Sequence, residues 1–190
     1  MALWGATDAD ESKPKWMTTA DKKEVLATTA GWVVEAGSAM TGNDNTASTP
    51  EVLVATGGLT TSLGAATIDS VDWNITTFDK SAGGTLSVTV RYNEAVDVAT
   101  SNPTLVVTNS VNSNHTLTYA SGTGSNELVF TLVIAAANAA TDADDVLSVA
   151  AQSVVLASSS TIKDAGTATN AELVITAGQG TAAGTITVVA

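Results

Sequence analysis

The sequence predicts an all-β protein: a β-sandwich with Greek-key connections, preceded by an extended N-terminal arm with one short helix. Hydrophobic residues make up 44% of the 190-residue chain but aromatic residues only 4%. The apolar content is therefore mostly Ala, Val, Leu and Ile, and with many Thr and Ser beside it this composition favours strands over long helices. From residue 66 onward, about seven short runs with alternating apolar and polar residues recur between turn-forming residues, a spacing typical of a sandwich.

The strand pattern is clearest in residues 86–92, where large apolar side chains alternate with Ser, Thr and Arg. Such alternation puts the apolar side chains on one face, so we expect this strand to bury that face. The other predicted strands occupy residues 68–78, 104–108, 115–119, 127–134, 146–156 and 172–176. A last strand, 185–189, follows a Gly-rich link and is predicted to pair either with the arm or with another chain.

The first 65 residues predict an arm with one short helix. Thr18 and Thr19 precede a run of good helix formers from Asp21 to Ala27, with an acidic residue in the first turn, which is typical of a helix start. A helix of this length is unstable unless it packs on something. Because the segment holds too little apolar mass for a core of its own, we divide the chain into a docking arm (1–65), a sandwich (66–177) and a C-terminal strand and tail (178–190).

The charge of the chain argues against nucleic acid as a partner. The formal net charge is -12, from 7 Lys and Arg against 19 Asp and Glu. Phosphate contacts need clustered Lys and Arg, whereas only Lys80, Arg91 and Lys163 lie beyond residue 66. The absence of cysteine excludes disulfides and thiolate metal sites.

The sequence carries no sign of secretion or membrane insertion. Its beginning lacks the basic and apolar regions of a signal peptide. No apolar run approaches the ~20 residues that cross a bilayer. We therefore expect synthesis in a cytoplasm and no membrane partner.

Four stretches of the sandwich segment share a pattern with a known family. They are 86–98, with Glu94-Ala-Val96 near its end, then Pro103-Thr-Leu105, then 117–130, and finally 162–166, with Asp164-Ala-Gly166. Over residues 66–177 this order resembles the bacterial Ig-like repeats of large surface and adhesion proteins. The resemblance implies an Ig-like β-sandwich. That family normally occurs in tandem, whereas this chain holds a single copy.

The beginning of the chain carries a second resemblance. Met1-Ala-Leu-Trp-Gly5, Lys13-Pro-Lys-Trp16 and Ala30-Gly-Trp-Val33 are similar to the start of virion structural proteins from marine tailed phages of the cyanophage type. This implies a head decoration (cement) protein that binds the major capsid protein lattice in many copies, with contacts between copies, on the outer surface of the capsid. The alternative is a tail, fibre or cell-surface adhesion module that binds carbohydrate or a receptor.

The arm holds the residues that we expect to contact a partner. Three of the four tryptophans lie in the first 32 residues. Burying one indole is worth on the order of 5 kcal/mol, so these rings could offset the free-energy cost of association. Lysines of the arm would pair with carboxylates of the partner. The predicted partner-binding residues are Trp4, Lys13, Lys15, Trp16, Lys22, Lys23 and Trp32. The alternative is that the indoles fold back on their own sandwich.

The sequence does not predict an enzyme. His115 is the single histidine, no Gly-x-Ser-x-Gly element accompanies it, and the acidic residues are scattered over turns. A carbohydrate site would need exposed aromatics, but the alternation predicts that most aromatics of the sandwich lie in its core.

One loop raises the question of a metal. It carries Asp142, Asp144 and Asp145, and oxygen-only clusters suit Ca²⁺. Further acidic residues that folding might bring to this loop are Glu94, Asp97 and Asp164. The spacing is not that of an EF-hand, and solvated turn acids are the preferred interpretation. We therefore expect no cofactor, with Ca²⁺ as the one candidate.

Overall fold

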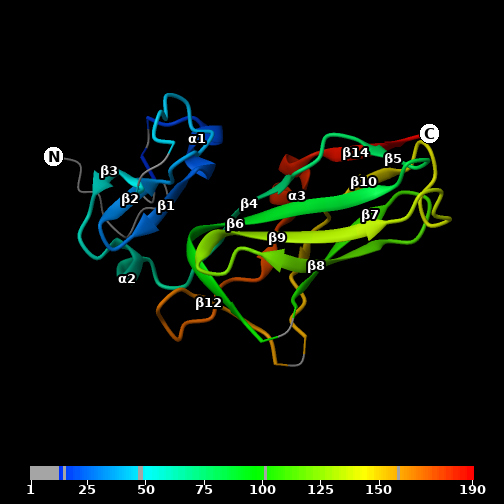
Figure 1. The fold of residues 1–190 in the computed structure, drawn as a ribbon. Helices are drawn as coiled ribbons and strands as arrows, with labels where there is room; N and C mark the ends of the chain where they lie inside the picture. Colours follow the sequence, from blue (N-terminus) through cyan, green and yellow to red (C-terminus); the bar gives the residue numbers. More distant parts are fainter. Residues whose placement is uncertain (1–12, 15, 47–48, 101, 158) are drawn as a thin grey trace.

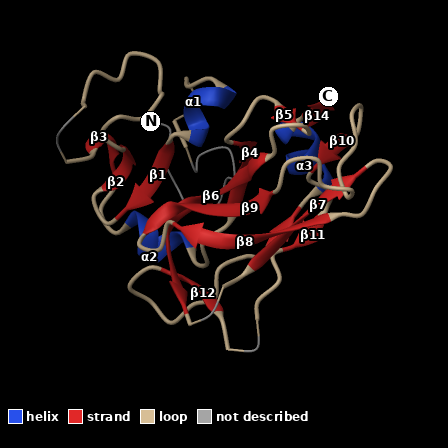
Figure 2. Ribbon diagram, turned by 45° about the vertical axis from the view of Figure 1, so that its right-hand side comes forward, coloured by secondary structure: helices blue, strands red, loops and turns tan. Residues whose placement is uncertain are grey.

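The computed structural model describes residues 13–14, 16–46, 49–100, 102–157 and 159–190, and it is mainly β (Figures 1 and 2). This confirms the all-β prediction. In chain order the strands are β1 (Val25–Thr28), β2 (Gly31–Val34), β3 (Glu51–Ala55), β4 (Ile68–Trp73), β5 (Phe78–Asp79), β6 (Gly84–Ala99), β7 (Thr104–Asn109), β8 (His115–Ser121), β9 (Ser125–Ile134), β10 (Val146–Ser148), β11 (Gln152–Ser153), β12 (Thr161–Asp164), β13 (Val174–Ile175) and β14 (Thr185–Val189). The helices of this part are α1 (Thr19–Lys23), α2 (Leu59–Leu63) and α3 (Ala177–Ala183).

The long strand β6 organises the fold (Figure 1). It pairs antiparallel with β9, β4 and β12 and makes one parallel contact with β1, where Ala27 lies opposite Glu94. Its side chains at even positions are buried from Leu86 to Val96, while Ser87 and Arg91 face outward and are half-buried. The alternation seen in the sequence therefore predicted correctly which face is buried.

The strands form one continuous mixed sheet, plus the separate pair β11–β13. Along its main path the order is β3-β2-β1-β6-β9-β8-β7-β10-β14-β5. The pairing does not divide this path into two separate sheets, because β10 pairs with both β7 and β14. The last strand, β14, pairs antiparallel with β10 and parallel with β5. Both partners belong to residues 66–190 of the same chain, whereas the sequence predicted pairing with the arm or with another chain.

The sheet encloses one large hydrophobic core. We call residues 66–190, which contain this core, the body. Apolar residues of β6, β7, β8 and β9 contact those of β5, β10, β13 and β14. Phe78, Tyr92 and Phe130 are buried in this core and Trp73 and Tyr119 pack against it, as the sequence predicted. The hydroxyl of Tyr92 donates to the carbonyl of Glu172 at 3.0 Å, which satisfies the polar end of a buried ring.

The predicted strand 146–156 is interrupted. Only 146–148 and 152–153 are strands, and between them the backbone leaves the ladder with β7. The side chain of Gln152 replaces the missing backbone partner: its Oε1 accepts from the N–H of Val106 at 2.9 Å, and its Nε2 donates to the Val106 carbonyl at 2.7 Å.

The N-terminal segment is a folded lobe rather than an extended arm, which corrects the prediction. We call residues 16–63 the N-terminal lobe, of which 47 and 48 are outside the described residues. Strands β1, β2 and β3 form an antiparallel sheet whose own core contains Met17, Val25, Ala27 and Trp32. The predicted helix ends at Lys23, because Val25–Thr28 pair with β2 instead. Gly31 permits this tight packing: its φ is +129°, and a Cβ would lie 2.0 Å from the carbonyl oxygen of Val54.

None of the helices in the described residues has the length and apolar composition needed to span a membrane.

Candidate functional site at the junction of the N-terminal lobe and the body

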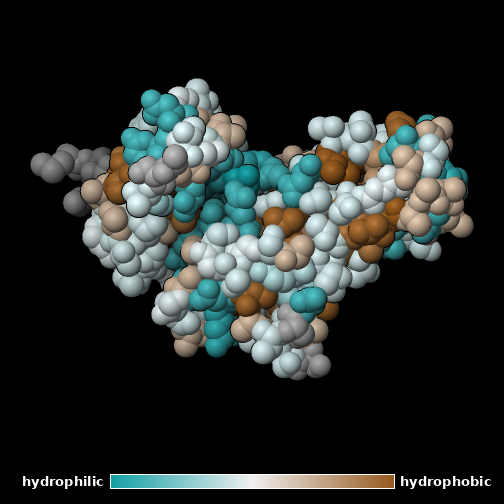
Figure 3. Space-filling model, viewed as in Figure 1, coloured by the Kyte–Doolittle hydropathy of each residue, from teal (hydrophilic) through white to brown (hydrophobic). Residues whose placement is uncertain are grey.

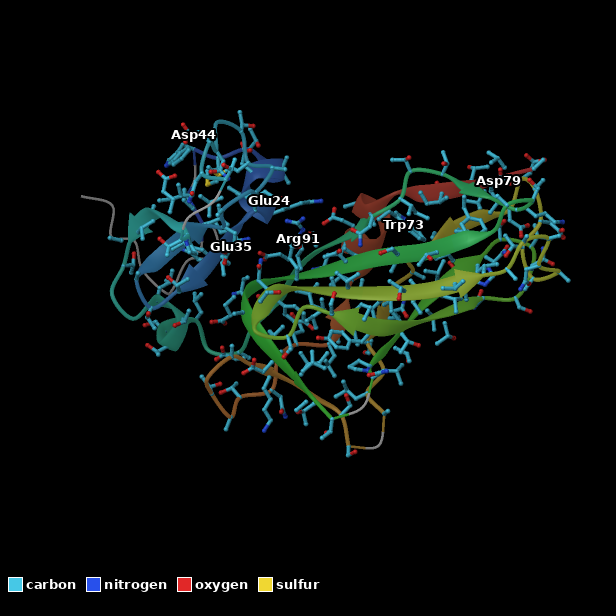
Figure 4. All side chains as sticks on the ribbon, in the orientation of Figure 1. Glu24, Glu35, Asp44, Trp73, Asp79 and Arg91 are labelled. Carbon is cyan, nitrogen blue, oxygen red and sulfur yellow. The ribbon has the colours of Figure 1, made fainter. Side chains whose placement is uncertain are left out.

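A cluster of charged side chains around Arg91 joins the N-terminal lobe to the body. Arg91 lies on the outward face of β6, and its Nη1 is 2.7 Å from Oε1 of Glu24 in the lobe and 3.1 Å from Oε1 of Glu127 on β9. Its Nε is 3.6 Å from Oδ2 of Asp72 on β4. The Arg91 side chain is 18% exposed, so water screens these contacts only in part. Figure 4 shows Glu24 and Arg91 facing each other across the junction.

Two lysines near the N-terminus, Lys13 and Lys23, strengthen this junction. Nζ of Lys23 lies 2.7 Å from Oδ1 of Asp72, and Lys13 forms an ion pair with Asp69. Lys13 also donates to the carbonyl of Lys22 at 2.6 Å and lies 5.9 Å from the ring centre of Trp32, a cation–π contact. Burial lowers the pKa of Lys13, and the neighbouring Asp69 carboxylate opposes that shift. Lys13 and Lys23 are thus paired with carboxylates of the same chain.

A polar cleft of ≈ 460 Å³ opens beside this cluster, where Figure 3 shows hydrophilic residues in the hollow between lobe and body. It combines three carboxylates with the single guanidinium of Arg91. Glu24 is already engaged, because it also accepts a hydrogen bond from the Ser38 hydroxyl at 2.8 Å. The cleft is lined by Glu24, Glu35, Ala36, Gly37, Ser38, Ala39, Arg91, Ser125, Asn126 and Glu127. Because Arg91 is already paired with carboxylates, the cleft offers no free positive charge to an anionic ligand.

The seven residues predicted to contact a partner have different fates. Trp16 is 72% exposed just before α1. Lys22 and Lys23 are half-buried on α1, and Lys23 is paired with Asp72. Trp32 is only 1% exposed and Lys13 8%, so neither is presented to a partner, which corrects the prediction for both. Trp4 and Lys15 lie outside the described residues. Trp32 is buried because β1, β2 and β3 form a core around it, which the expected arm would have lacked.

The candidate calcium ligands of the loop are not brought together as a ligand set. Asp142 forms an ion pair with Lys80. Oδ2 of Asp145 accepts hydrogen bonds from the amides of Asn109 and Asn112 at 2.8 and 3.0 Å, and the residue is 1% exposed. Asp144 is exposed and has a φ of 69°. Within the part of the chain that the structure describes, no three or more Asp, Glu, His or Cys side chains are placed to hold a metal.

His115 is buried at the start of β8. Its Nε2 lies 3.3 Å from the hydroxyl oxygen of Thr141. Burial lowers the pKa of the imidazole, and the charge of Asp145 opposes that shift. The imidazole therefore packs between a core strand and the loop that follows β9.

Sequence reasoning did not predict that Glu94 is buried without a hydrogen-bond partner among the described residues. This residue on β6 is 0% exposed, and neither carboxylate oxygen has a hydrogen-bond partner among the described residues. Burial, and then the charge of Asp164, raise the pKa of Glu94 to about 7. The alternation along β6 contained the signal, since Glu94 occupies an even position in a row of core residues.

Comparisons with family models, with curated proteins and with solved structures find no significant match to this chain. What the chain does must therefore be inferred from its own residues. The informative ones are the exposed Trp16, the charged cluster around Arg91 and the buried Glu94.

Replacing Arg91 with Met is expected to lower the free energy of unfolding by about 2 kcal/mol, because it leaves three partly buried carboxylates without their shared cation. Urea unfolding measures the change. The control is Lys80→Met, whose partner Asp142 is half exposed, and a loss of at most about 0.5 kcal/mol is expected there. Equal losses in the two variants would show that the Arg91 cluster has no special role in joining the lobe to the body.

Proposed function

We propose that this protein is a non-enzymatic structural component of a tailed-phage virion, in which it serves as a head decoration protein on the major capsid protein lattice. In this proposal the body is a single Ig-like β-sandwich with Greek-key connections, which faces outward, and the N-terminal lobe contacts the capsid. The lobe takes the place of the extended docking arm expected from the sequence.

The exposed Trp16 is the observation that carries this proposal. Its side chain is 72% exposed, although a buried indole contributes several kcal/mol to an interface. It belongs to a lobe that ion pairs hold against the body. A surface that is already folded loses less conformational entropy on binding than a disordered arm does. More of the free energy gained by burying the indole therefore contributes to affinity.

The arrangement of the body supports the Ig-like assignment. Antiparallel strands β4, β6, β9, β8 and β7 follow one another in space, and β10 and β14 bring a second set of apolar side chains to the same core. The net charge of -12 supports an outward position, since an acidic surface stays soluble at high copy number and does not adsorb nucleic acid.

The test is co-sedimentation of the purified protein with capsids of the encoding phage that lack it. Wild-type protein is expected to saturate the capsids, and Trp16→Ala is expected to weaken binding by tenfold or more, about 1.4 kcal/mol, as for an interface hot spot. The matched control is Val111→Ala, which removes an apolar side chain that is 77% exposed in the body. Absence of wild-type binding, or an equal loss in both variants, would contradict the proposal.

The second candidate is a tail, fibre or cell-surface adhesion module, because an exposed indole can also stack on a sugar ring. Phe78, Tyr92 and Phe130 are buried and add nothing to such a platform. Binding of wild-type protein to host-cell polysaccharide, lost in Trp16→Ala and without any binding to capsids, would favour this candidate.

A further inference from the structure

The buried carboxyl group of Glu94 has no hydrogen-bond donor beside it among the described residues. This holds for both of its oxygens, and the residue is 0% exposed. A carboxylate in such a place has to be neutralised by a proton, a charged partner or a metal ion. The nearest basic side chain along β6, that of Arg91, lies on the opposite face and is engaged by Glu24 and Glu127.

A second buried acid lies beside Glu94. In the antiparallel pairing of β6 with β12, Asp164 is directly opposite Val96, and the N–H of Ala165 donates to the carbonyl of Ala95 at 2.9 Å. Glu94 is two residues from Val96 on β6, so this pairing brings Glu94 and Asp164 close to each other diagonally. The charge of Asp164 acts on the Glu94 carboxyl group and contributes to the raised pKa of Glu94. Asp164 is 5% exposed.

Thr167 adds a further side-chain oxygen to those of these two acids. The hydroxyl of Thr167 donates to Oδ2 of Asp164 at 3.0 Å and lies 3.3 Å from the Asp164 carbonyl oxygen, so all three side chains present oxygen atoms. Two carboxylates near one another disfavour two negative charges, whereas the attraction of both to a divalent cation between them would offset their desolvation cost and their mutual repulsion. Oxygen ligands of this kind select hard cations.

We propose that Glu94 and Asp164 form a Ca²⁺ site between β6 and β12. With two acidic side chains in the set, the remaining ligands are backbone carbonyls or water, which Ca²⁺ accepts because it takes six to eight oxygens in flexible geometry. Mg²⁺ suits the site poorly, since it demands octahedral geometry and keeps its water shell. The site is distinct from the loop with Asp142, Asp144 and Asp145.

The proposed Ca²⁺ site lies where the N-terminal lobe, β6 and β12 come together, so a bound ion would affect the stability of the fold. Glu94 also lies opposite Ala27, the one residue pair through which β1 of the N-terminal lobe joins β6. An ion held there would connect the lobe, β6 and the closing strand β12. Bound Ca²⁺ is therefore expected to stabilise the folded protein, in proportion to how far its concentration exceeds the dissociation constant.

The test is thermal unfolding of the full chain at about pH 8, in moderate salt, with either EDTA or millimolar Ca²⁺. Wild-type protein is expected to gain about 5 °C in Tm with Ca²⁺, and much less with Mg²⁺. Glu94→Gln and Asp164→Asn are expected to lose this gain. Asp97→Asn, which removes an exposed carboxylate from the same strand, is the matched control and is expected to keep it.

Isothermal titration of wild-type protein with CaCl₂ provides a readout that needs no variant, with one ion bound per chain as the expected result. The proposal is overturned if Ca²⁺ changes neither the Tm nor the heat of titration of wild-type protein. It is likewise overturned if Glu94→Gln and Asp164→Asn stay folded and respond to Ca²⁺ as Asp97→Asn does. Capsid binding plays no part in either experiment, so this result and that of the decoration test are independent.

Discussion

Replacing Glu94 with Gln is expected to stabilise the protein by about 3 kcal/mol at pH 8 in the presence of EDTA, and to change its stability little at pH 4.5. The reason is that burial disfavours the charged carboxylate, while the neutral amide of Gln carries no charge to desolvate. Glu94 is 0% exposed, so water screens this effect less than it does for the acids on the surface.

The sign follows from the pKa of Glu94, which folding raises from 4.5 to about 7. The folded state therefore holds its proton more tightly than the unfolded state. The stabilisation from this proton is complete below pH 4.5 and is lost as the pH rises to about 7, with a slope of at most about 1.4 kcal/mol per pH unit for one proton. Above pH 7 the folded protein carries the buried charge.

Urea unfolding between about pH 4.5 and pH 8 measures this difference, with EDTA present so that no divalent cation contributes. The quantity to follow is the free energy of unfolding of Glu94→Gln minus that of wild type, which removes the titration of the other acids. Asp97→Asn, the exposed control, is expected to give a difference close to zero throughout. A difference for Glu94→Gln that does not change with pH would contradict a raised pKa at this position.

Replacing Trp32 with Ala is expected to destabilise the N-terminal lobe by about 3–5 kcal/mol, the range for removing a large buried side chain. The ring is 1% exposed and is the largest side chain of the lobe's core. This core is separate from that of the body. The lobe is therefore expected to open while the body stays folded.

Hydrogen exchange separates the two parts. In Trp32→Ala, protection of the amides in β1, β2 and β3 is expected to fall by two orders of magnitude or more, and that of β6 and β9 to change much less. Trp16→Ala serves as the control, since an exposed indole leaves stability within about 0.5 kcal/mol. A uniform loss over lobe and body would show that they unfold as one cooperative unit.

Local patterns in the sequence were enough to predict several elements. The alternation in residues 86–92 predicted the buried face of β6, and the positions of Phe78, Tyr92 and Phe130 predicted core residues. Thr18 predicted the beginning of α1, where its hydroxyl accepts from the N–H of Asp21 at 3.1 Å. These features depend on neighbours within a few residues.

The candidate sites depended on contacts that no local pattern contains. Lys13 pairs with Asp69 and Lys23 with Asp72, 56 and 49 residues away in sequence. A charged side chain has the same local pattern whether its partner is in its own chain or in another. The sequence therefore could not show that these lysines are used within the chain.

By itself, the sequence determined an acidic, mainly β chain without cysteine, in which side-chain alternation selects the inner face of each long strand. Only the tertiary structure decided that the first 65 residues include a folded lobe with Trp32 inside it, and that Glu94 and Asp164 are both buried on the paired strands β6 and β12. The physical reason is that burial and electrostatic pairing are properties of positions in space, and for these residues the neighbours in space are distant in sequence.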